Sequence, residues 1–442
     1  MKFIACGDAL FSSRNLVNRL DQKLIDYLLH ADAVFANAEF CTPQQTTPPA
    51  SGRGYMTSVN PQTLDEFVDL NIKLLSFANN HIGDFGWKGV LDTIDAAEKR
   101  NLIHCGIGRS IEEARQPRFL DTPLGRIGII ATSTTRSEVF AASSAGAGIA
   151  ARPGLNPLRW GQAYVLPEKE FEELKKIDQL LGTAQSRLEG LKVETWPIPG
   201  PDEFKFGSLF EGNLQIEKGE YAHVRTFIKE KDAKATLNSI KDASKRSDLT
   251  ILSLHTHEGI NENWYSPYPP AFVEEFARKA IDAGATAVIG HGAHLLRGVE
   301  IYKGKPIFYN IGSLLMEFEA GESKIPPEMY EVYGLDKTSY PSDLHRARSQ
   351  DKDGNFIGFS ADRRFSKNVL VVFHKDKDNL SFELLPLDLG LNREHPLDRG
   401  LPQIASPEVG YEIAHDLNRI SQRYGTQFVY NKDKGTIIIN SI

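Results

Sequence analysis

The chain has 442 residues and a net charge of −7. This length suits one large α/β domain with insertions or two domains, and the negative charge supplies no basic field for a nucleic-acid partner. Three cysteines without a CxxC pair argue against a disulfide scaffold or a cysteine-ligated zinc site. The sequence enters a strand-like run at once and has no apolar stretch of membrane length, so we expect a cytoplasmic protein with no membrane partner.

Strand and helix signals alternate through the first 135 residues. Apolar runs predict strands, and apolar residues at three- and four-residue spacing predict helices. The predicted strands are 3–6, 33–36, 73–78, 102–105 and 126–132, and the predicted helices are 15–30, 61–70 and 87–99. Such alternation indicates a largely parallel sheet covered by helices.

The middle of the chain interrupts this rhythm. An Ala/Ser/Gly-rich stretch makes 136–166 a long loop, and the spacing of apolar residues predicts one long helix over 168–191. We interpret 160–248 as a helical insertion that serves as a lid or a dimer arm. A homodimer is therefore one of the expected arrangements. The catalytic domain would then comprise 1–159 and 249–442.

The α/β rhythm resumes after the insertion. A second, irregular insertion is expected over 319–366, followed by an antiparallel pair of strands at 368–374 and 380–389. The remaining predicted elements are strands 249–254, 287–290 and 307–311, helices 270–283 and 406–423, and a final hairpin of 428–430 with 437–439.

Polar clusters follow directly on five of the predicted strands. Ligands of open α/β sheets bind at the carboxyl ends of the strands, so we expect these side chains to converge. The candidate metal ligands are Asp8, Glu39, Asn80, His255, His257, His291 and His294, and His81 lies beside Asn80. Carboxylates, an amide and imidazoles suit one or two ions of Mn²⁺, Fe²⁺ or Zn²⁺. Each cluster alone also has a plain structural interpretation, as a helix cap, a turn or a buried hydrogen bonder.

The order of these motifs resembles a known family. Gly7-Asp8, Asn37-Ala38-Glu39, Ala78-Asn79-Asn80-His81 and the run from Gly290-His291-Gly292-Ala293-His294 to Gly312-Ser313 are similar to the bacterial capsule-synthesis CapA family, which is linked to poly-γ-glutamate. That family is similar in turn to the calcineurin-like metallophosphoesterases. The resemblance implies an α/β fold with a two-sheet β-sandwich flanked by helices, a four-layer αββα arrangement, and a dinuclear metal centre.

The resemblance also implies roles for single residues. Asp8, Asn80, His291 and His294 match metal ligands, and Glu39 matches the acidic residue that bridges the two ions. His255 matches a further ligand with His257 as a rival or addition, and His81 matches the histidine that protonates the leaving group. The chain departs from the pattern at Leu10, where phosphoesterases usually carry histidine, at Glu39 in place of aspartate, and at Ser313 in place of asparagine.

Arginines in Gly- or Pro-rich loops flank the expected site. Arginine binds carboxylate or phosphate in a bidentate manner, so these residues are candidates for holding an anionic substrate, although solvated surface positions explain each of them as well. The candidates are Arg53, Arg136, Arg152, Arg159 and Arg297.

These observations favour a metal-dependent hydrolase that uses metal-activated water. We expect it to cleave an amide or peptide-like bond, such as a γ-glutamyl bond, in an anionic small-molecule or peptide-like substrate. The alternatives are a metallophosphoesterase with the same centre and a non-catalytic factor in capsule biosynthesis or export. A fold does not by itself determine the reaction.

Overall fold

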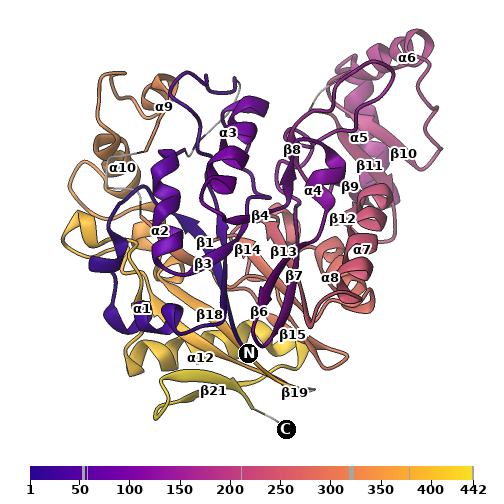
Figure 1. The fold of residues 1–442 in the computed structure, drawn as a ribbon. Coiled ribbons are helices and arrows are strands. Elements are labelled where there is room, and N and C mark those ends of the chain that lie inside the picture. Colours follow the sequence, from indigo (N-terminus) through magenta and orange to yellow (C-terminus); the bar gives the residue numbers. More distant parts are fainter. Residues whose placement is uncertain (52–54, 57, 211, 318–322, 378, 441–442) are drawn as a thin grey trace.

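The computed structural model of the protein describes residues 1–51, 55–56, 58–210, 212–317, 323–377 and 379–440. It confirms a mixed α/β protein. Among the described residues, two large mixed sheets lie face to face, with helices on their outer surfaces (Figure 1).

The first large sheet has the strand order β21-β22-β19-β18-β1-β2-β3-β4, with β17 beside β1 and β20 beside β19. Its β1 to β4 are parallel, and β18 joins β1 antiparallel. The bounds are β1 Lys2–Leu10, β2 Ala33–Ala38, β3 Ile72–Ser76, β4 Ile103–Cys105, β17 Ser313–Met316, β18 Lys367–Asp376, β19 Asn379–Asp388, β20 Gln403–Ile404, β21 Phe428–Asn431 and β22 Thr436–Ile439. The predicted antiparallel pairing of 368–374 with 380–389 is confirmed by β18 and β19.

The second large sheet has the order β15-β16-β14-β13-β7-β6. Its β7, β13, β14 and β16 are parallel, whereas the edge strands β6 and β15 are antiparallel to their neighbours. The bounds are β6 Arg118–Thr122, β7 Gly125–Ser133, β13 Leu249–Thr256, β14 Ala287–Gly292, β15 Val299–Tyr302 and β16 Lys305–Phe308.

Side-chain alternation along the strands builds the core. On β1, Phe3 and Ala5 face the second sheet and pack with residues such as Ile129 and Ile251, whereas Ile4 and Cys6 face the outer helices. Helices α1 (Gln22–Leu29), α2 (Asp65–Asp69) and α3 (Gly86–Glu98) cover the first sheet, and α7 (Glu230–Ser244) and α8 (Ala271–Asp282) cover the second. Helix α12 (Pro407–Ser421) packs on the last strands, and α4 (Ile111–Arg115) precedes β6.

Three predicted helices differ from the observed elements. The helix expected over 15–30 is a 3₁₀ turn (Leu16–Asn18) followed by α1, because Asp21 caps a new helix by accepting from the backbone of Lys23. The stretch 61–70 likewise begins as a 3₁₀ turn (Pro61–Leu64) before α2. The helix expected over 168–191 is divided into α5 (Glu168–Leu180) and α6 (Thr183–Val193) at Gly182, whose φ of 77° ends the first helix.

The segment 160–248 contains a small sheet as well as helices, so the description as a helical insertion is incomplete. Its order is β10-β11-β9-β12, with bounds β9 Trp160–Leu166, β10 Glu203–Phe206, β11 Leu214–Lys218 and β12 His223–Ile228. Phe171 of α5 packs on this sheet with Phe204 and Ile216. The loop expected over 136–166 also contains β8 (Gly154–Leu155), which pairs with β5 (Ile107–Gly108).

The segment 319–366 contains short helices where it is described. They are α9 (Pro327–Val332), α10 (Pro341–Ser349) and α11 (Gly358–Ala361). Figure 1 shows α9 and α10 on one side of the molecule and α5 and α6 on the other, both at the end opposite the chain termini.

A candidate metal centre between the two sheets

The predicted ligands converge where the parallel strands of both sheets end. Asp8 lies near the end of β1, which has an irregular register with β2 between Ala5 and Asp8. Gly7 permits this geometry, because a Cβ there would lie 1.8 Å from the carbonyl oxygen of Gly312. The backbone N–H of Asp8 donates to that same carbonyl at 3.1 Å. Close contact between β1 and the segment before β17 thus positions Asp8.

Asp8, His255 and His291 form the first of two buried triads. His291 Nδ1 lies 3.2 Å and His255 Nδ1 lies 3.8 Å from Asp8 Oδ1, and the two Nδ1 atoms are 3.1 Å apart. All three side chains are fully buried. Their ligand atoms lie within 4.8 Å of one another, so this triad could hold a metal ion.

Glu39, His257 and His294 form the second triad. Glu39 Oε1 lies 3.6 Å from His257 Nε2, 3.7 Å from His294 Nε2 and 3.8 Å from Nε2 of His255. Neither carboxylate oxygen of the fully buried Glu39 has a hydrogen-bond partner among the described residues. A buried carboxylate without partners is costly, and buried charges in proteins are normally paired or bind a metal.

The spacing fits a metal ion better than direct hydrogen bonds. Nitrogen and oxygen ligands lie about 2.0–2.2 Å from a divalent ion, so two ligands of one ion are separated by about 3–4 Å. The distances around Glu39 are 3.6–3.8 Å, beyond the range of a hydrogen bond. The donor set of carboxylate and imidazole also suits a borderline divalent ion.

The electrostatics of the site leave two of the candidate ligands, His255 and His257, neutral. Burial lowers the pKa values of His255 and His257 well below their usual range, so both rings are neutral near pH 7. Burial alone would raise the pKa of Asp8, but hydrogen bonds and charge from His291 and His294 hold it well below its usual range. Burial, followed by the nearby Asp8 carboxylate, raises the pKa of Glu39 well above its usual value.

The raised pKa of Glu39 predicts how the metal-free protein responds to pH. The unfolded chain releases this proton near pH 4.5, whereas the folded protein retains it to higher pH. The stability that Glu39 contributes is therefore complete below pH 4.5, and it is lost as the pH rises through the pKa of Glu39 in the folded protein. In EDTA, we expect wild type to lose stability relative to Glu39→Gln above pH 4.5, by at most about 1.4 kcal/mol per pH unit. Urea unfolding of both proteins across pH 4.5–8 measures this, and a constant difference would contradict it.

Asn80 and His81 follow β3 at the same edge. Asn80 Oδ1 lies 2.7 Å from His255 Nε2. His81 Nδ1 lies 2.7 Å from Asp84 Oδ2, which leaves Nε2 directed towards the centre, 4.0 Å from Glu39 Oε1. The pair of His81 and Asp84 has the form of an oriented proton donor.

Residues outside the predicted set hold the ligands in place. Asn37 Nδ2 donates to Asp8 Oδ1 at 2.9 Å, and the backbone N–H of Gly292 donates to Asp8 Oδ2 at 2.7 Å. Ser253 Oγ lies 2.7 Å from His291 Nε2. Such supporting hydrogen bonds orient metal ligands. His294 has a positive φ of 57°, a backbone strain of the kind that functional sites retain.

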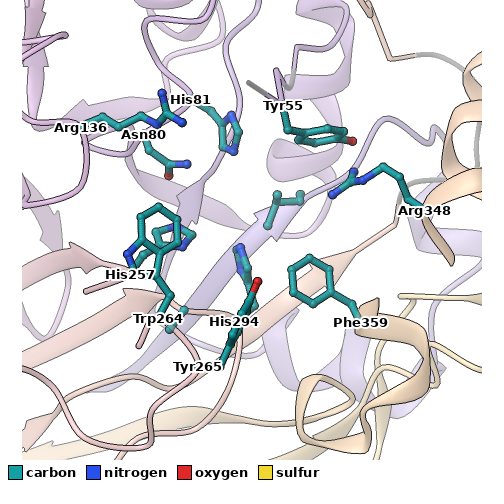
Figure 2. Close-up of a pocket in the computed structure, with 12 residues that line it drawn as sticks. Tyr55, Asn80, His81, Arg136, His257, Trp264, Tyr265, His294, Arg348 and Phe359 are labelled. Carbon is teal, nitrogen blue, oxygen red and sulfur yellow. The ribbon is translucent and has the colours of Figure 1, made fainter. Parts of the chain in front are cut away.

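A cavity of about 250 Å³ opens over the second triad. Figure 2 shows Asn80, His81, His257 and His294 directed into it, with Arg136 and Arg348 on opposite sides of His81. Aromatic side chains form much of the remaining wall, namely Tyr55, Trp264, Tyr265 and Phe359. Of the two arginines in this wall, the sequence singled out Arg136 as a candidate for binding substrate.

Arg297 has a structural position, which corrects its expected role in substrate binding. The side chain is fully buried and donates to the carbonyl oxygens of His257, Glu258, Trp264 and Ser266 at 2.8–3.2 Å. Burial lowers its pKa to about 10, so it stays charged near pH 7. Arg297 thus fixes the loop that carries His257.

Arg152 and Arg159, two further predicted arginines, are not brought to the cavity. Arg159 pairs with Asp232 of α7 through Nε at 2.6 Å and Nη2 at 2.9 Å, and Arg152 Nε donates to the carbonyl oxygen of Ala141 at 3.0 Å. Neither is among the described residues that line the cavity. Arg53 lies outside the described residues.

Replacing Arg297 with methionine is expected to destabilise the protein by about 3 kcal/mol or more, because buried carbonyl oxygens lose a charged donor. The change in the free energy of unfolding, from urea denaturation, measures the effect. The matched control is Arg363→Met, at an exposed arginine 3.6 Å from Glu412, which should change stability by less than about 0.5 kcal/mol. Equal effects of the two substitutions would contradict the structural role.

The departures from the resembled pattern lie at the site itself. Leu10 lines the cavity with an apolar side chain. Ser313 Oγ lies 3.3 Å from His294 Nδ1, so the serine still contacts a predicted ligand.

Among the described residues, no helix is long and apolar enough to span a lipid bilayer.

Comparison with known proteins agrees with the motifs. The chain is 29% identical to the uncharacterized protein y4sH of Sinorhizobium fredii (strain NBRC 101917 / NGR234) over 98% of this chain and 92% of that protein. It is 21% identical to the PGA biosynthesis protein CapA of Bacillus subtilis (strain 168), over 72% of this chain and 63% of that protein. It is also 21% identical to the capsule biosynthesis protein CapA of Bacillus anthracis, over 66% of this chain and 52% of that protein.

The family profile described as "Bacterial capsule synthesis protein PGA_cap" matches residues 2–317. This span includes both triads, His81 and the β-strands that carry them. The resemblance expected from the motifs is confirmed, and the chain belongs to the PGA_cap family of bacterial capsule synthesis proteins.

Proposed function

We propose that this protein is a metal-dependent hydrolase whose centre is formed by the two buried triads. The observation that carries the proposal is Glu39: its buried carboxylate has no hydrogen-bond partner among the described residues, and three imidazole Nε2 atoms lie 3.6–3.8 Å from one of its oxygens. A purely structural carboxylate at such depth would be hydrogen-bonded. Asp8, His255 and His291 would hold one ion, and Glu39, His257 and His294 would hold a second. Asn80 would support them through His255, whose Nε2 lies 2.7 Å from Asn80 Oδ1.

The arrangement divides the chemistry between the ions and the protein. A bound divalent ion would supply Lewis-acid activation of water and of the scissile group. His81 would donate a proton to the leaving group from Nε2, and Asp84 would stabilise the charged ring through Nδ1. Arg136 would bind a negatively charged part of the substrate beside Asn80 (Figure 2).

We propose an amide or peptide-like bond in an anionic substrate, such as a γ-glutamyl bond, as the target. The arginines of the cavity wall support an anionic substrate. The names of the CapA relatives support a polymer of the capsule as its source. The pair of face-to-face sheets with outer helices also supports the likeness to calcineurin-like metallophosphoesterases.

A phosphoesterase is the second candidate, because the same arginines suit phosphate. Against it stands Leu10, which places an apolar side chain on the cavity wall where phosphoesterases usually carry histidine. A polymer-binding factor in capsule biosynthesis is the third, supported by the names of the relatives alone.

The test is hydrolysis by purified protein reconstituted with Mn²⁺, Zn²⁺ or Fe²⁺. γ-Glutamyl amides and a phosphodiester chromogen are assayed side by side, with EDTA-treated protein as the control. Metal-dependent cleavage of the amides supports the first proposal, and cleavage of the phosphodiester alone supports the second. Failure to bind a divalent ion at all would overturn both.

A further inference from the structure

One wall of the cavity comes from a part of the chain beyond the matched family span. Arg348 is in the last turn of α10 and Phe359 is in α11, whereas the family profile ends at residue 317. The triads, His81 and Arg136 all lie inside that span. The metal centre is therefore built from the family region, and the wall across the cavity from Arg136 is an addition to it (Figure 2).

This added wall is anchored in its own core. Met329 and Tyr330 of α9 and Leu344 of α10 are buried together with Met56. Phe359 contacts Phe365, with ring centroids 4.5 Å apart, and its ring lies 6.1 Å from that of His294. Packing on both sides fixes α10 and α11 beside the second triad, so Arg348 has a defined place.

The ring of Tyr55 packs against the Arg348 guanidinium. The Cζ atom of Arg348 lies 3.5 Å from the centroid of that ring, and Tyr55 also lines the cavity. Cation–π attraction holds a guanidinium over an aromatic ring, and arginine binds carboxylate or phosphate groups in a bidentate manner. In Figure 2 this group lies across the cavity from the side chain of Asn80.

We propose that Arg348 determines substrate specificity by binding a second anionic group of the substrate, a carboxylate or a phosphate-like group, at the wall away from the metal ligands. The proposal rests on the proposed metal centre, which would bind the first anionic oxygen. Phe359 supplies apolar surface between Arg348 and the metal ligands, and Tyr265 supplies more beside His294. The preferred substrate thus carries an anion a short distance from the bond that is cleaved, separated from it by an apolar segment.

A binding experiment tests this without requiring turnover. Succinate carries two carboxylates, and succinamate replaces one of them with a neutral amide. With Mn²⁺-loaded protein in isothermal titration calorimetry, wild type should bind succinate about tenfold or more tightly than succinamate. Arg348→Gln should lose this preference, and Arg348→Lys should keep part of it. The control is Arg346→Gln, which removes the same charge from an exposed position of α10 and should keep the full preference.

The outcomes separate this inference from the hydrolase itself. A wild type without preference, or an Arg348→Gln variant that keeps it, overturns the role of Arg348 even if the protein hydrolyses amides. The expected loss in Arg348→Gln supports it even if every hydrolysis assay is negative. 3-Phosphonopropionate in place of succinate distinguishes the two anions: tighter binding than succinate assigns a phosphate-like group, and weaker binding assigns a carboxylate. The thermal unfolding midpoint of each variant shows that the fold is intact.

Discussion

His81→Ala is expected to lower turnover by about 10²–10⁴-fold while the protein keeps its metal. The reason is geometric: Nδ1 is held at 2.7 Å by Asp84, and Nε2 is directed into the cavity, 4.0 Å from Glu39 Oε1. In the proposed hydrolase, a proton donor at this place would assist departure of the leaving group but would not be needed to hold an ion. The measurements are kcat on the best γ-glutamyl amide and metal content by mass spectrometry, on the same preparations.

Two further variants sharpen this test. Asp84→Asn should give a smaller loss, because the ring remains but its charged form is less stabilised. His30→Ala, at an exposed histidine outside the site, should change neither activity nor metal content. Loss of metal from His81→Ala would show that His81 is a ligand, and full activity would show that it does not donate the proton.

Each triad is expected to hold its own ion. His291→Ala should remove one ion per chain and His257→Ala should remove the other, because each histidine belongs to a different triad. Substituting groups that only support ligands typically weakens metal affinity 10–100-fold, so loss of a ligand should cost more than about 100-fold. Equilibrium dialysis with Mn²⁺ measures both stoichiometry and affinity. The loaded variants should also lose up to about 2.7 kcal/mol of metal-dependent stability at a metal concentration 100 times the wild-type Kd.

The control lies in a third group of possible ligands, Glu98, His104 and Glu113. Arg109 already pairs with both glutamates there, at 2.8–3.0 Å, and Glu98 is exposed, so His104→Ala should leave metal content unchanged. If either triad variant binds as many ions as wild type, the assignment of that triad is wrong. Loss of both ions from one variant would mean that the two sites fill together.

The edge where the ligands meet could be predicted because it depends on local patterns. Apolar runs gave the strands, and parallel strands place their carboxyl ends together. Asp8, Glu39, His255 and His291 could therefore be placed near one another without coordinates. Their supports could not, because Ser253 looks like any polar residue inside a strand until the register pairs β13 with β14. Whether these residues hold an ion stays a prediction.

The cavity wall and the small sheet depended on tertiary contacts. Arg348 lies in a charged, irregular stretch, and nothing local shows that α9 packs on Met56 and brings α10 to the site. The donors of Arg297 meet four carbonyl groups, which a sequence does not reveal. An arginine in a glycine-rich loop therefore suggests substrate binding until the structure is known. Strands such as β10 and β12 are half-exposed, so they lack the apolar run that marks the central strands.

Both layers of the molecule contribute candidate ligands. Asp8 and Glu39 belong to strands or strand ends of the first sheet, and His255 and His291 belong to strands of the second. An ion bound by residues of both sheets would cross-link the two sheets at their shared edge. It would join segments as distant in sequence as Asp8 and His291. Because the ion would bind only when the two sheets are packed together, part of its binding free energy would add to the free energy of unfolding. Metal supply would then govern the lifetime of the folded protein as well as its chemistry.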